Sequence, residues 1–535
     1  MTRRGKTTRL AAAVAATALA FGCTHAGERA ASRSQLVFSG LAGEPDNLNP
    51  AFSNLSDELN FSHLYMSYLV EDDARGNPVP EIASAVPSLE NGGISRDQKT
   101  IVYRLRPNVR WQDGAPLTAR DVVFSYAAIV NPRNNVATRA GYAEVAAIRA
   151  QGDRTVVVRL RHPFSPFVQY FFGPMGVGAL MPEHLLRGVA DLNHAAYNER
   201  PVGSGPYRVV RWEHGDRIVL AANPLYWRGK PRISELVYRI IPDPNTRLEQ
   251  LSTGEADAYF DVDPLLLPQA RAIAGARIAL TPVNDMHVLR FNVRDPALAD
   301  VRVRRAISMA IDRRTLIAAA THGSGLLVNA DQPVGGWAYD PHVPGVPYDP
   351  AAARRFLSRR SLSLTLEISP SVVNGSALVA AIVQENLRAA GVHVTIKQYP
   401  GNMMYGPAAG SGVLAGGRYQ LAYDAWWVLG SDPDDSWNFG CDQIPPAGLN
   451  YSFWCDGTAD AAMNAARATV DRSRRTAQYA IVQRAVARDL PVFVLWQVRL
   501  PDAYRTYVRG IAPPTGGSTF WNAWSWSLSQ ARRYG

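Results

Sequence analysis

Residues 99–130 read KTIVYRLRPNVRWQDGAPLTARDVVFSYAAIV, and this run decides the fold class. Apolar side chains alternate along its first part, as they do in a half-buried strand, at Ile101, Tyr103 and Leu105. The pair Asp113-Gly114 then turns the chain. Thr118, with Asp121 three residues later, has the pattern of a capping box and predicts a helix that begins here. The order strand, turn, helix is typical of an α/β protein.

Strands and helices continue to alternate along the rest of the chain. We expect strands at residues 34–42, 287–293, 362–368, 392–399 and 491–498. We expect helices at residues 57–70, 245–260, 301–320 and 376–390, one that begins at Pro350, and a helical pair at residues 458–490. The unit at residues 362–399 reads strand, helix, strand, which favours parallel pairing. With 535 residues, 47% of them hydrophobic, the chain is long enough for two or three domains.

Two further segments bear on how the domains connect. A strand is preceded by residues that interrupt regular structure, namely Gly203, Gly205 and Pro206. Such an interruption is expected where the chain crosses between domains. Residues 516–535 form a polar, tryptophan-rich tail with little regular pattern. A tail of this kind is expected to cross back to an earlier domain.

The amino-terminus has the pattern of a secretory signal. Four basic residues precede an apolar run at residues 10–21, which is too short to span a bilayer. Residues 20–23, AFGC, form an imperfect lipobox, in which Cys23 would receive a lipid after removal of residues 1–22. The alternative is a plain signal that is cleaved near Ala26. Both interpretations predict an exported protein.

Charge, hydropathy and cysteine content limit the classes of protein to which the chain could belong. Removal of residues 1–22 would lower the formal net charge from +10 to +6, and the excess is spread along the chain, so nucleic acid is not an expected partner. No later apolar stretch is long enough for a transmembrane helix. If Cys23 carries lipid, Cys441 and Cys455 remain as a pair that could close a disulfide loop worth about 3 kcal/mol. Two unpaired buried thiols are the alternative.

Catalytic and metal-binding motifs are not evident. The sequence contains no Gly-x-Ser-x-Gly, Ser-x-x-Lys, His-Glu-x-x-His or Gly-x-x-x-x-Gly-Lys pattern. Its ten histidines include no i, i+4 pair, and His287, inside an apolar strand, is interpreted as a core residue. We therefore expect no metal, no cofactor and no enzymatic activity.

Residues 426–443, WWVLGSDPDDSWNFGCDQ, form the most unusual stretch of the chain. Counted as a calcium loop from Asp432, it has Trp437 where a sharp turn needs glycine and Gln443 where a bidentate glutamate is needed, so calcium is excluded. Asp432 and Asp434 could still be a pair of acid/base carboxylates. A solvated loop is the other interpretation, particularly for Asp434 and Asp435.

The tryptophans of this stretch indicate a cleft. Trp426 and Trp427 lie on a strand that we expect to end at Gly430, so the two indoles should face opposite sides. An aromatic side chain at the end of a strand commonly lines a ligand cleft.

In this order, the blocks resemble the family 5 extracellular solute-binding proteins of ABC importers, a group that binds dipeptides, oligopeptides or nickel. The most specific matches are residues 96–126 and FNVRDPALADVRVRRAISMAIDR at residues 291–313. Further matches are EPDNLNP, PVGSGPYRV, NPLYW, YDPAAARRFL, the segment from DAWW to DPDD, and PVFVLW. The resemblance covers the chain from about residue 36 to near its end.

The resemblance implies an α/β, two-lobed, periplasmic-binding-protein-like fold of type II, from the large cluster with an extra subdomain. The core of lobe I would comprise residues 36–52, 201–286 and 499–535, the extra subdomain residues 53–200, and lobe II residues 287–498. Two crossing strands would form the hinge. The resemblance also implies a monomeric binding protein that delivers its solute to an ABC permease and ATPase.

The resemblance raises a question about the ligand. Peptide-binding members carry an aspartate three residues after the tryptophan and four before the proline of this segment, and it pairs with the free amino group of the peptide. Trp426 and Pro433 keep this separation, but Leu429 stands at the intervening position. An ammonium buried against leucine would keep its desolvation cost without an ion pair. Either Asp432 or Asp434 replaces the missing acid, or the solute is not an ordinary free peptide.

The ligand-binding candidates are thus Trp426, Trp427, Leu429, Asp432 and Asp434. Short peptides or a peptide-like solute are the leading expectation. Nickel or a nickel chelate, an exported hydrolase and a surface interaction lipoprotein remain as alternatives.

Overall fold

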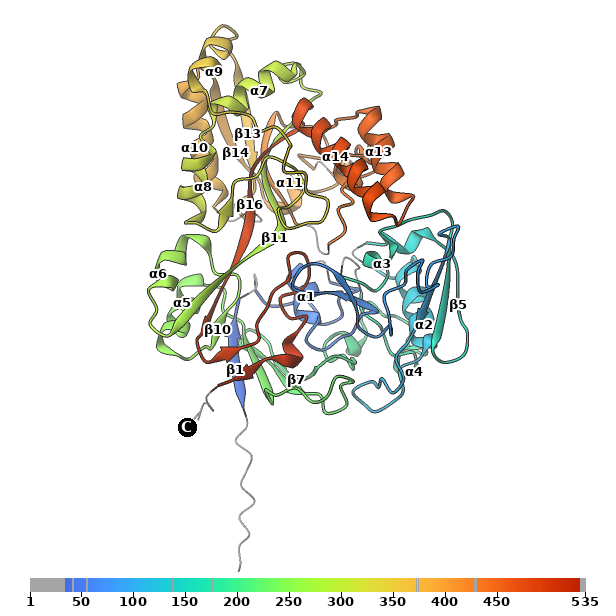
Figure 1. Ribbon diagram of the computed structural model, residues 1–535. Helices are drawn as coiled ribbons and strands as arrows, with labels where there is room; N and C mark the ends of the chain where they lie inside the picture. The colour runs from blue at the N-terminus through green and yellow to red at the C-terminus, as the bar shows by residue number, and fades with distance from the viewer. Residues whose placement is uncertain are drawn as a thin grey trace, which may run out of the picture.

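The computed structural model describes residues 34–40, 43–53, 56–136, 138–174, 178–371, 373, 375–410, 412–427 and 431–529. Its centre is an 11-stranded sheet that extends through both halves of the molecule (Figure 1). In spatial order the strands are β14 (His393–Gln398), β13 (Ser363–Ile368), β15 (Leu421–Trp427), β11 (Ala276–Phe291), β16 (Val492–Arg505), β10 (Ala258–Tyr259), β1 (Gln35–Ser39), β9 (Glu235–Arg239), β8 (Arg217–Ala222) and β7 (Tyr207–Glu213). The short strand β12 (Gly325–Leu326) pairs with β16.

Two long strands connect the halves of this sheet. β11 and β16 run antiparallel from Ala276 opposite Arg505 to Arg290 opposite Val492, and Figure 1 shows both passing from the upper to the lower half. Their register shifts between Pro282 and Met286. The buried side chain of Gln497 donates hydrogen bonds to the carbonyls of Val283 and Val334 beside the shift, which satisfies backbone groups that the ladder leaves unpaired.

The upper half of the sheet is covered by helices and has its own core. These helices are α7 (Val301–Ala310), α8 (Arg313–Thr321), α9 (Pro350–Leu357), α10 (Ser376–Ala389), α13 (Gly457–Arg467) and α14 (Arg472–Asp489), with the single turns α11 (Gly401–Met404) and α12 (Ser436–Phe439) nearby. β13 pairs in parallel with both β14 and β15, and Gly391 follows α10 with a φ of 85°. The predicted strand-helix-strand unit is confirmed.

The lower half combines the other end of the sheet with smaller elements. Its helices are α1 (Ser56–Ser62), α2 (Ala119–Val130), α3 (Phe167–Tyr170), α4 (Glu183–Leu186), α5 (Pro244–Thr253) and α6 (Leu267–Arg271). Its small sheets are β2 (Val70–Asp72) with β3 (Pro78–Pro80), β4 (Thr100–Arg104) with β6 (Thr155–Leu160) and β5 (Val145–Ala150), and β17 (Val508–Arg509) with β18 (Ser527–Leu528). At the start of α2, the Thr118 side chain and the Asp121 carboxylate form the predicted capping box.

A single aromatic core joins distant segments of the lower half. Phe38 from β1 lies 5.6 Å from the ring centroid of Phe520 and 6.5 Å from that of Phe61. Trp526 is fully buried and stacks on Phe260. The tail therefore crosses back to the first part of the chain, as expected from its composition.

Gly203 and Gly205 are required by a close approach of two backbones. A Cβ atom on Gly203 would lie 1.8 Å from the carbonyl oxygen of Tyr65, and one on Gly205 would lie 2.4 Å from that of Met66. The amide of Tyr207 donates to the carbonyl of Leu64 in the same contact. Glycine allows the strand entry at residues 203–207 to lie directly on residues 64–66.

This contact also explains one wrong prediction. The helix expected at residues 57–70 ends at Ser62, and residues 70–72 form β2. The carbonyls of Leu64 and Tyr65 accept hydrogen bonds from Tyr207 and Gly205 instead of from the next helical turn. Tertiary pairing outweighs local helix propensity here.

Two other expected helices are shorter than predicted. The helix at residues 301–320 is divided into α7 and α8, because the Asp312 carboxylate accepts from the amides of Arg314 and Thr315 and starts a new helix. The helix at residues 245–260 ends at Thr253, because Gly254 is left-handed with a φ of 85°, and Ala258–Tyr259 joins the sheet as β10. Strand β16 extends well beyond residue 498.

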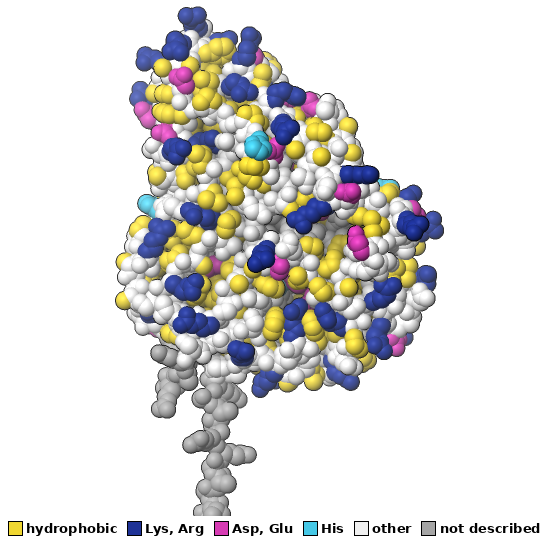
Figure 2. All heavy atoms as spheres, viewed as in Figure 1, with side chains coloured by type: hydrophobic (Ala, Val, Ile, Leu, Met, Phe, Trp, Pro, Cys, Tyr) yellow, Lys and Arg dark blue, Asp and Glu magenta, His cyan; other side chains and the backbone are white. Residues whose placement is uncertain are grey.

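Among the residues that the structure describes, no helix is both long enough and apolar enough to cross a membrane. On the face seen in Figure 2, Lys and Arg side chains are scattered and do not form one basic patch.

Candidate functional site

A cavity lies where the two halves of the molecule face each other. Its interior measures about 130 Å³, and the space widens to about 800 Å³ when the opening to solvent is included. Its walls come from the loop after β2 at residues 75–76, the crossing strand β11, residues 331–337, residues 426 and 431–435, the start of α14, and residues 515–516 of the tail. A solute bound there would contact both halves.

Trp426 forms part of the wall at the end of β15. It stands opposite Met286 in the sheet and packs edge-on against Phe439, with ring centroids 6.0 Å apart. The guanidinium of Arg290 lies 5.5 Å from the Trp426 ring. Only 7% of Trp426 is exposed, so most of the residue packs inside the protein and a small part lines the cavity.

The other candidates of this strand end are Trp427 and Leu429. Trp427 pairs with Asp285 in the backbone register of β15 and β11. Its side chain, Leu429 and the expected strand end at Gly430 lie outside the described residues, as does Cys23.

The aspartates that follow do not form a solvated loop, so that interpretation of Asp434 and Asp435 is wrong. Asp432, Asp434 and Asp435 are 7%, 4% and 7% exposed. The loop is held inward by hydrogen bonds that Gln332 donates from Nε2 to the Pro433 carbonyl and to Oδ2 of Asp435, both at 3.1 Å.

Asp432 has a structural partner. Arg475 on α14 donates from Nη1 and Nη2 to its two carboxylate oxygens at 2.8 and 2.6 Å, and the same guanidinium bonds the Tyr479 hydroxyl. Bidentate pairs of this kind are strong and geometrically specific. Because Asp432 is saturated by Arg475, it is poorly suited to act as a general acid or base, and its carboxylate anchors the loop.

The carboxylate of Asp434 also has a neighbouring arginine, at a longer distance than the one that binds Asp432. The Arg467 Nε atom lies 3.8 Å from its Oδ2 atom, and Oδ1 accepts from the Ser436 amide at 3.3 Å. Burial raises the pKa of Asp434, an effect that Arg467 opposes. Both acids chosen from the sequence thus line the cavity with an arginine near each.

The pair Asp331 and Asp435 was missed by the sequence analysis. The two carboxyl groups lie within hydrogen-bonding reach of each other, and both line the cavity. Burial raises the pKa of each, and for Asp435 the neighbouring Asp331 raises it further. The available signal was one acid among buried apolar positions at residues 328–334, which is too weak to identify a partner elsewhere in the chain.

Direct contacts join the halves beside the cavity. Gln169 Nε2 donates to Oδ1 of Asp72 at 3.0 Å and to Oγ of Ser431 at 3.1 Å. The Ser165 amide donates to the Arg467 carbonyl at 2.7 Å. Burial raises the pKa of Asp72 to about 7. These bonds hold the loop at residue 431 against the lower half.

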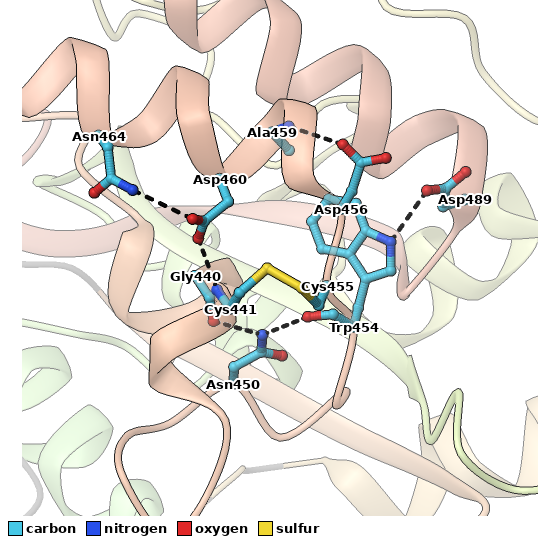
Figure 3. Close-up of a disulfide and its surroundings, with 10 residues drawn as sticks. All are labelled: Gly440, Cys441, Asn450, Trp454, Cys455, Asp456, Ala459, Asp460, Asn464 and Asp489. Atoms are coloured by element: carbon cyan, nitrogen blue, oxygen red, sulfur yellow. Dashed lines mark hydrogen bonds between the residues drawn. A yellow bond between two sulfur atoms is a disulfide. The ribbon is translucent and has the colours of Figure 1, made fainter.

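A disulfide between Cys441 and Cys455 braces the segment that follows the acidic loop (Figure 3). The Cys441 amide donates to Asp460, and Asn450 Nδ2 donates to the carbonyls of Gly440 and Trp454. The pairing foreseen from cysteine content is thus present, and the alternative of two free thiols is wrong.

We expect the Cys441→Ser/Cys455→Ser variant to unfold with a free energy about 3 kcal/mol lower, because the unfolded chain gains the entropy of an open loop. Urea unfolding measures this difference. A reducing agent should destabilise the native protein by a similar amount and leave the variant unchanged. A difference below about 0.5 kcal/mol would contradict a stabilising role for the bond.

The chain is similar to known proteins over most of its length. A family model described as bacterial extracellular solute-binding proteins, family 5 Middle, matches residues 77–443. The probable di/tripeptide-binding protein 5 of Pseudomonas aeruginosa is 27% identical over 482 residues, which cover 85% of this chain and 87% of that protein.

Solved structures share the fold. NikZ from Campylobacter jejuni, in complex with Ni(L-His), superimposes with a TM-score of 0.76 at 24% identity, over 92% of this chain and 99% of that one. The oligopeptide-binding protein AppA from Bacillus subtilis, in complex with a nonapeptide, superimposes with a TM-score of 0.76 at 22% identity. The superposition covers 93% of this chain and 100% of that one. These similarities establish the architecture of the chain.

Proposed function

Since this chain belongs to the bacterial extracellular solute-binding proteins of family 5, we propose that it captures short peptides, or a peptide-like solute, for an ABC importer. The observation that carries the proposal is the cavity between the halves of its two-lobed type II fold, with walls from both. Related proteins named for di- and tripeptides support the peptide class. The bound solute would pass to a permease and its ATPase.

The proposal includes the lobe boundaries predicted from the sequence. Lobe I would comprise residues 36–52, 201–286 and 499–535 with the extra subdomain 53–200, and lobe II would comprise residues 287–498. The hinge would lie in β11 and β16, where the register shifts next to Gln497. Closure about such a hinge would bring residues 72–76 and 164–170 against residues 431 and 466–470, the contacts described above.

We further propose that the protein works as an exported monomer without enzymatic activity. Cys23 would carry the lipid that anchors it to a membrane, after removal of residues 1–22. The carboxylates of the cavity would then serve binding: Asp432 is bound to Arg475, and Asp434 lies near Arg467.

Calorimetry and thermal unfolding with pools of dipeptides to pentapeptides test the function. The purified mature chain should release heat and unfold at a higher temperature when a pool contains a ligand, because binding only to the folded state stabilises it. No heat and no thermal shift with any pool would count against peptides as the solute class.

Leu429→Asp is expected to increase the affinity for free peptides about tenfold or more, because it restores an acid at the position where peptide-binding relatives pair the amino group. Titration of trialanine into both forms measures the change. Leu378→Asp, on an exposed leucine of α10, is the control and should bind like the native chain. Equal affinity in all three would show that position 429 does not set the choice of solute.

A further inference from the structure

We propose that Asp331 and Asp435 together bind a primary ammonium group of the solute, in place of the aspartate that is missing at Leu429. This inference rests on the proposed function, since it assigns a chemical class to the solute of the same cavity. It differs from the sequence expectation, which gave the substitute role to Asp432 or Asp434.

Asp331 and Asp435 are buried, and most of their carboxyl oxygens lack hydrogen-bond donors from other described residues. Asp331 is 4% exposed and Asp435 is 7% exposed. Within the described part of the chain, no residue outside the pair donates a hydrogen bond to either oxygen of Asp331 or to Oδ1 of Asp435. Buried carboxylate oxygens without donors are costly, and they are accounted for when a ligand supplies the donors.

Asp331 and Asp435 also differ from the other two acids of the cavity in having no neighbouring cation among the described side chains. The other two acids of the cavity have arginines: Asp432 is bound to Arg475, and Asp434 lies 3.8 Å from Arg467. No ion pair with Asp331 or Asp435 is formed by any residue that the structure describes. Gln332 gives Asp435 a neutral hydrogen bond only. Among the four described acids that line the cavity, Asp331 and Asp435 are therefore the two without a neighbouring cation.

The chemistry of two adjacent carboxyl groups favours an ammonium group over a metal ion as the cation. Two adjacent carboxyl groups share a proton because both cannot ionise without a counter-charge. An ammonium group offers three N–H donors, which can reach oxygens of both carboxylates with charge-assisted hydrogen bonds. Among the described residues, no group of three or more His, Cys, Asp or Glu side chains could hold a metal ion. Two carboxylates alone fall short of the six to eight oxygens that Ca²⁺ takes.

The rest of the cavity suits the remainder of a short peptide. Trp337 and Trp426 provide apolar wall, and Arg472 lies 5.0 Å from the Trp337 ring. Arg75 lines the cavity with an exposed side chain. A zwitterionic peptide could direct its ammonium to the acid pair and its carboxylate toward these arginines, which distinguishes its two ends.

Three tripeptides separate the sources of an ammonium group. Trialanine carries it at the amino-terminus, N-acetyl-Ala-Ala-Lys carries it on a side chain, and N-acetyl-trialanine has none. Calorimetric titration should give binding of at least one ammonium-bearing peptide that is about tenfold or more tighter than binding of N-acetyl-trialanine. If trialanine binds more tightly than N-acetyl-Ala-Ala-Lys, the acid pair binds the amino-terminus of the solute. If the order is reversed, it binds a side-chain ammonium group.

The same titrations on variants assign the residues. Asp331→Asn, Asp435→Asn and the double variant should each lose about tenfold or more in affinity for the preferred peptide and little for N-acetyl-trialanine. Asp442→Asn, an exposed acid in the next loop, should bind like the native chain. Unfolding temperatures without peptide check that each variant is folded.

Proton release gives a second readout that needs no variant. Binding an ammonium favours the ionised form of both carboxyl groups, so it should release protons, and the measured heat should depend on the ionisation enthalpy of the buffer. The other charged groups around the pair are acids and arginines of the neighbouring elements: Asp432, Asp434, Arg75, Arg467, Arg472 and Arg475.

Three results would overturn the inference: equal binding of all three tripeptides, native affinity in the double variant, or no binding of either ammonium-bearing peptide. In the last case the proposed function is judged separately, by mass spectrometry of the solute retained by the native protein. A retained peptide that lacks an ammonium group would leave that function standing and remove the role of the acid pair.

Discussion

Arg290→Met is expected to lower the free energy of unfolding by about 3–5 kcal/mol, because it removes the cation from a buried network and leaves an uncompensated carboxylate. Arg290, on β11, is 1% exposed and donates from Nε to Oδ2 of Asp424 on the adjacent strand at 2.8 Å. Its Nη1 atom also donates to Asn438 and Ser452. The change thus affects the junction of β11, β15 and the loop after the cavity.

Urea unfolding of Arg290→Met measures the loss, with Arg302→Met as the control. Arg302 has 74% of its side chain exposed, and its replacement should cost less than about 1 kcal/mol. Adding Asp424→Asn to Arg290→Met should recover part of the stability, since the orphaned charge is then removed. A loss below about 1 kcal/mol for Arg290→Met would show that the network contributes little to stability.

Arg475→Met should have a comparable effect on stability and a second effect on binding. The substitution leaves Asp432 buried without its bidentate partner, at an expected cost of about 3–5 kcal/mol. Since that pair fixes the loop at residues 431–435, Asp435 would also lose its position beside Asp331. Affinity for an ammonium-bearing tripeptide should therefore fall even where the variant remains folded.

The neighbouring Arg474→Met is a matched control, because the Arg474 side chain is 78% exposed on the same helix. It should retain native stability and affinity. Urea unfolding and calorimetry on both variants distinguish the effects. Native affinity in a folded Arg475→Met variant would contradict the anchoring role of this ion pair.

The local pattern of the sequence was sufficient for much of the fold. The strand, turn and capped helix of residues 99–130 are present, as are the parallel unit at residues 362–399 and the returning tail. These features depend on periodicity, on a capping pair such as Thr118 and Asp121, or on a glycine such as Gly391, all of which act over a few residues.

The errors occur where distant contacts decide local structure. The helix after residue 57 stops because backbone groups of residues 64 and 65 pair with residues 203–207, which no short pattern shows. The inward position of the acidic loop depends on Gln332, which bonds Asp435, and on Arg475, which bonds Asp432, and both belong to other segments. A run of acids on a turn has the same composition whether it is solvated or buried.

Three of the residues selected from the sequence as ligand-binding candidates line the cavity, and their role in binding stays a prediction. Trp426 and residues 431–435 line the cavity, and they include the candidates Asp432 and Asp434. The pair of Asp331 and Asp435 could not be found from spacing, since its members approach each other only in the folded chain.

The most direct test of the account is affinity selection from a random tripeptide library. The mature chain, refolded from denaturant to remove any retained solute, would be mixed with the library and separated from unbound peptide by gel filtration. Mass spectrometry of the bound fraction should find tripeptides with a free ammonium group enriched, and this enrichment should be lost in Asp331→Asn/Asp435→Asn. A native chain that retains no tripeptide would contradict the central claim that this cavity binds short peptides.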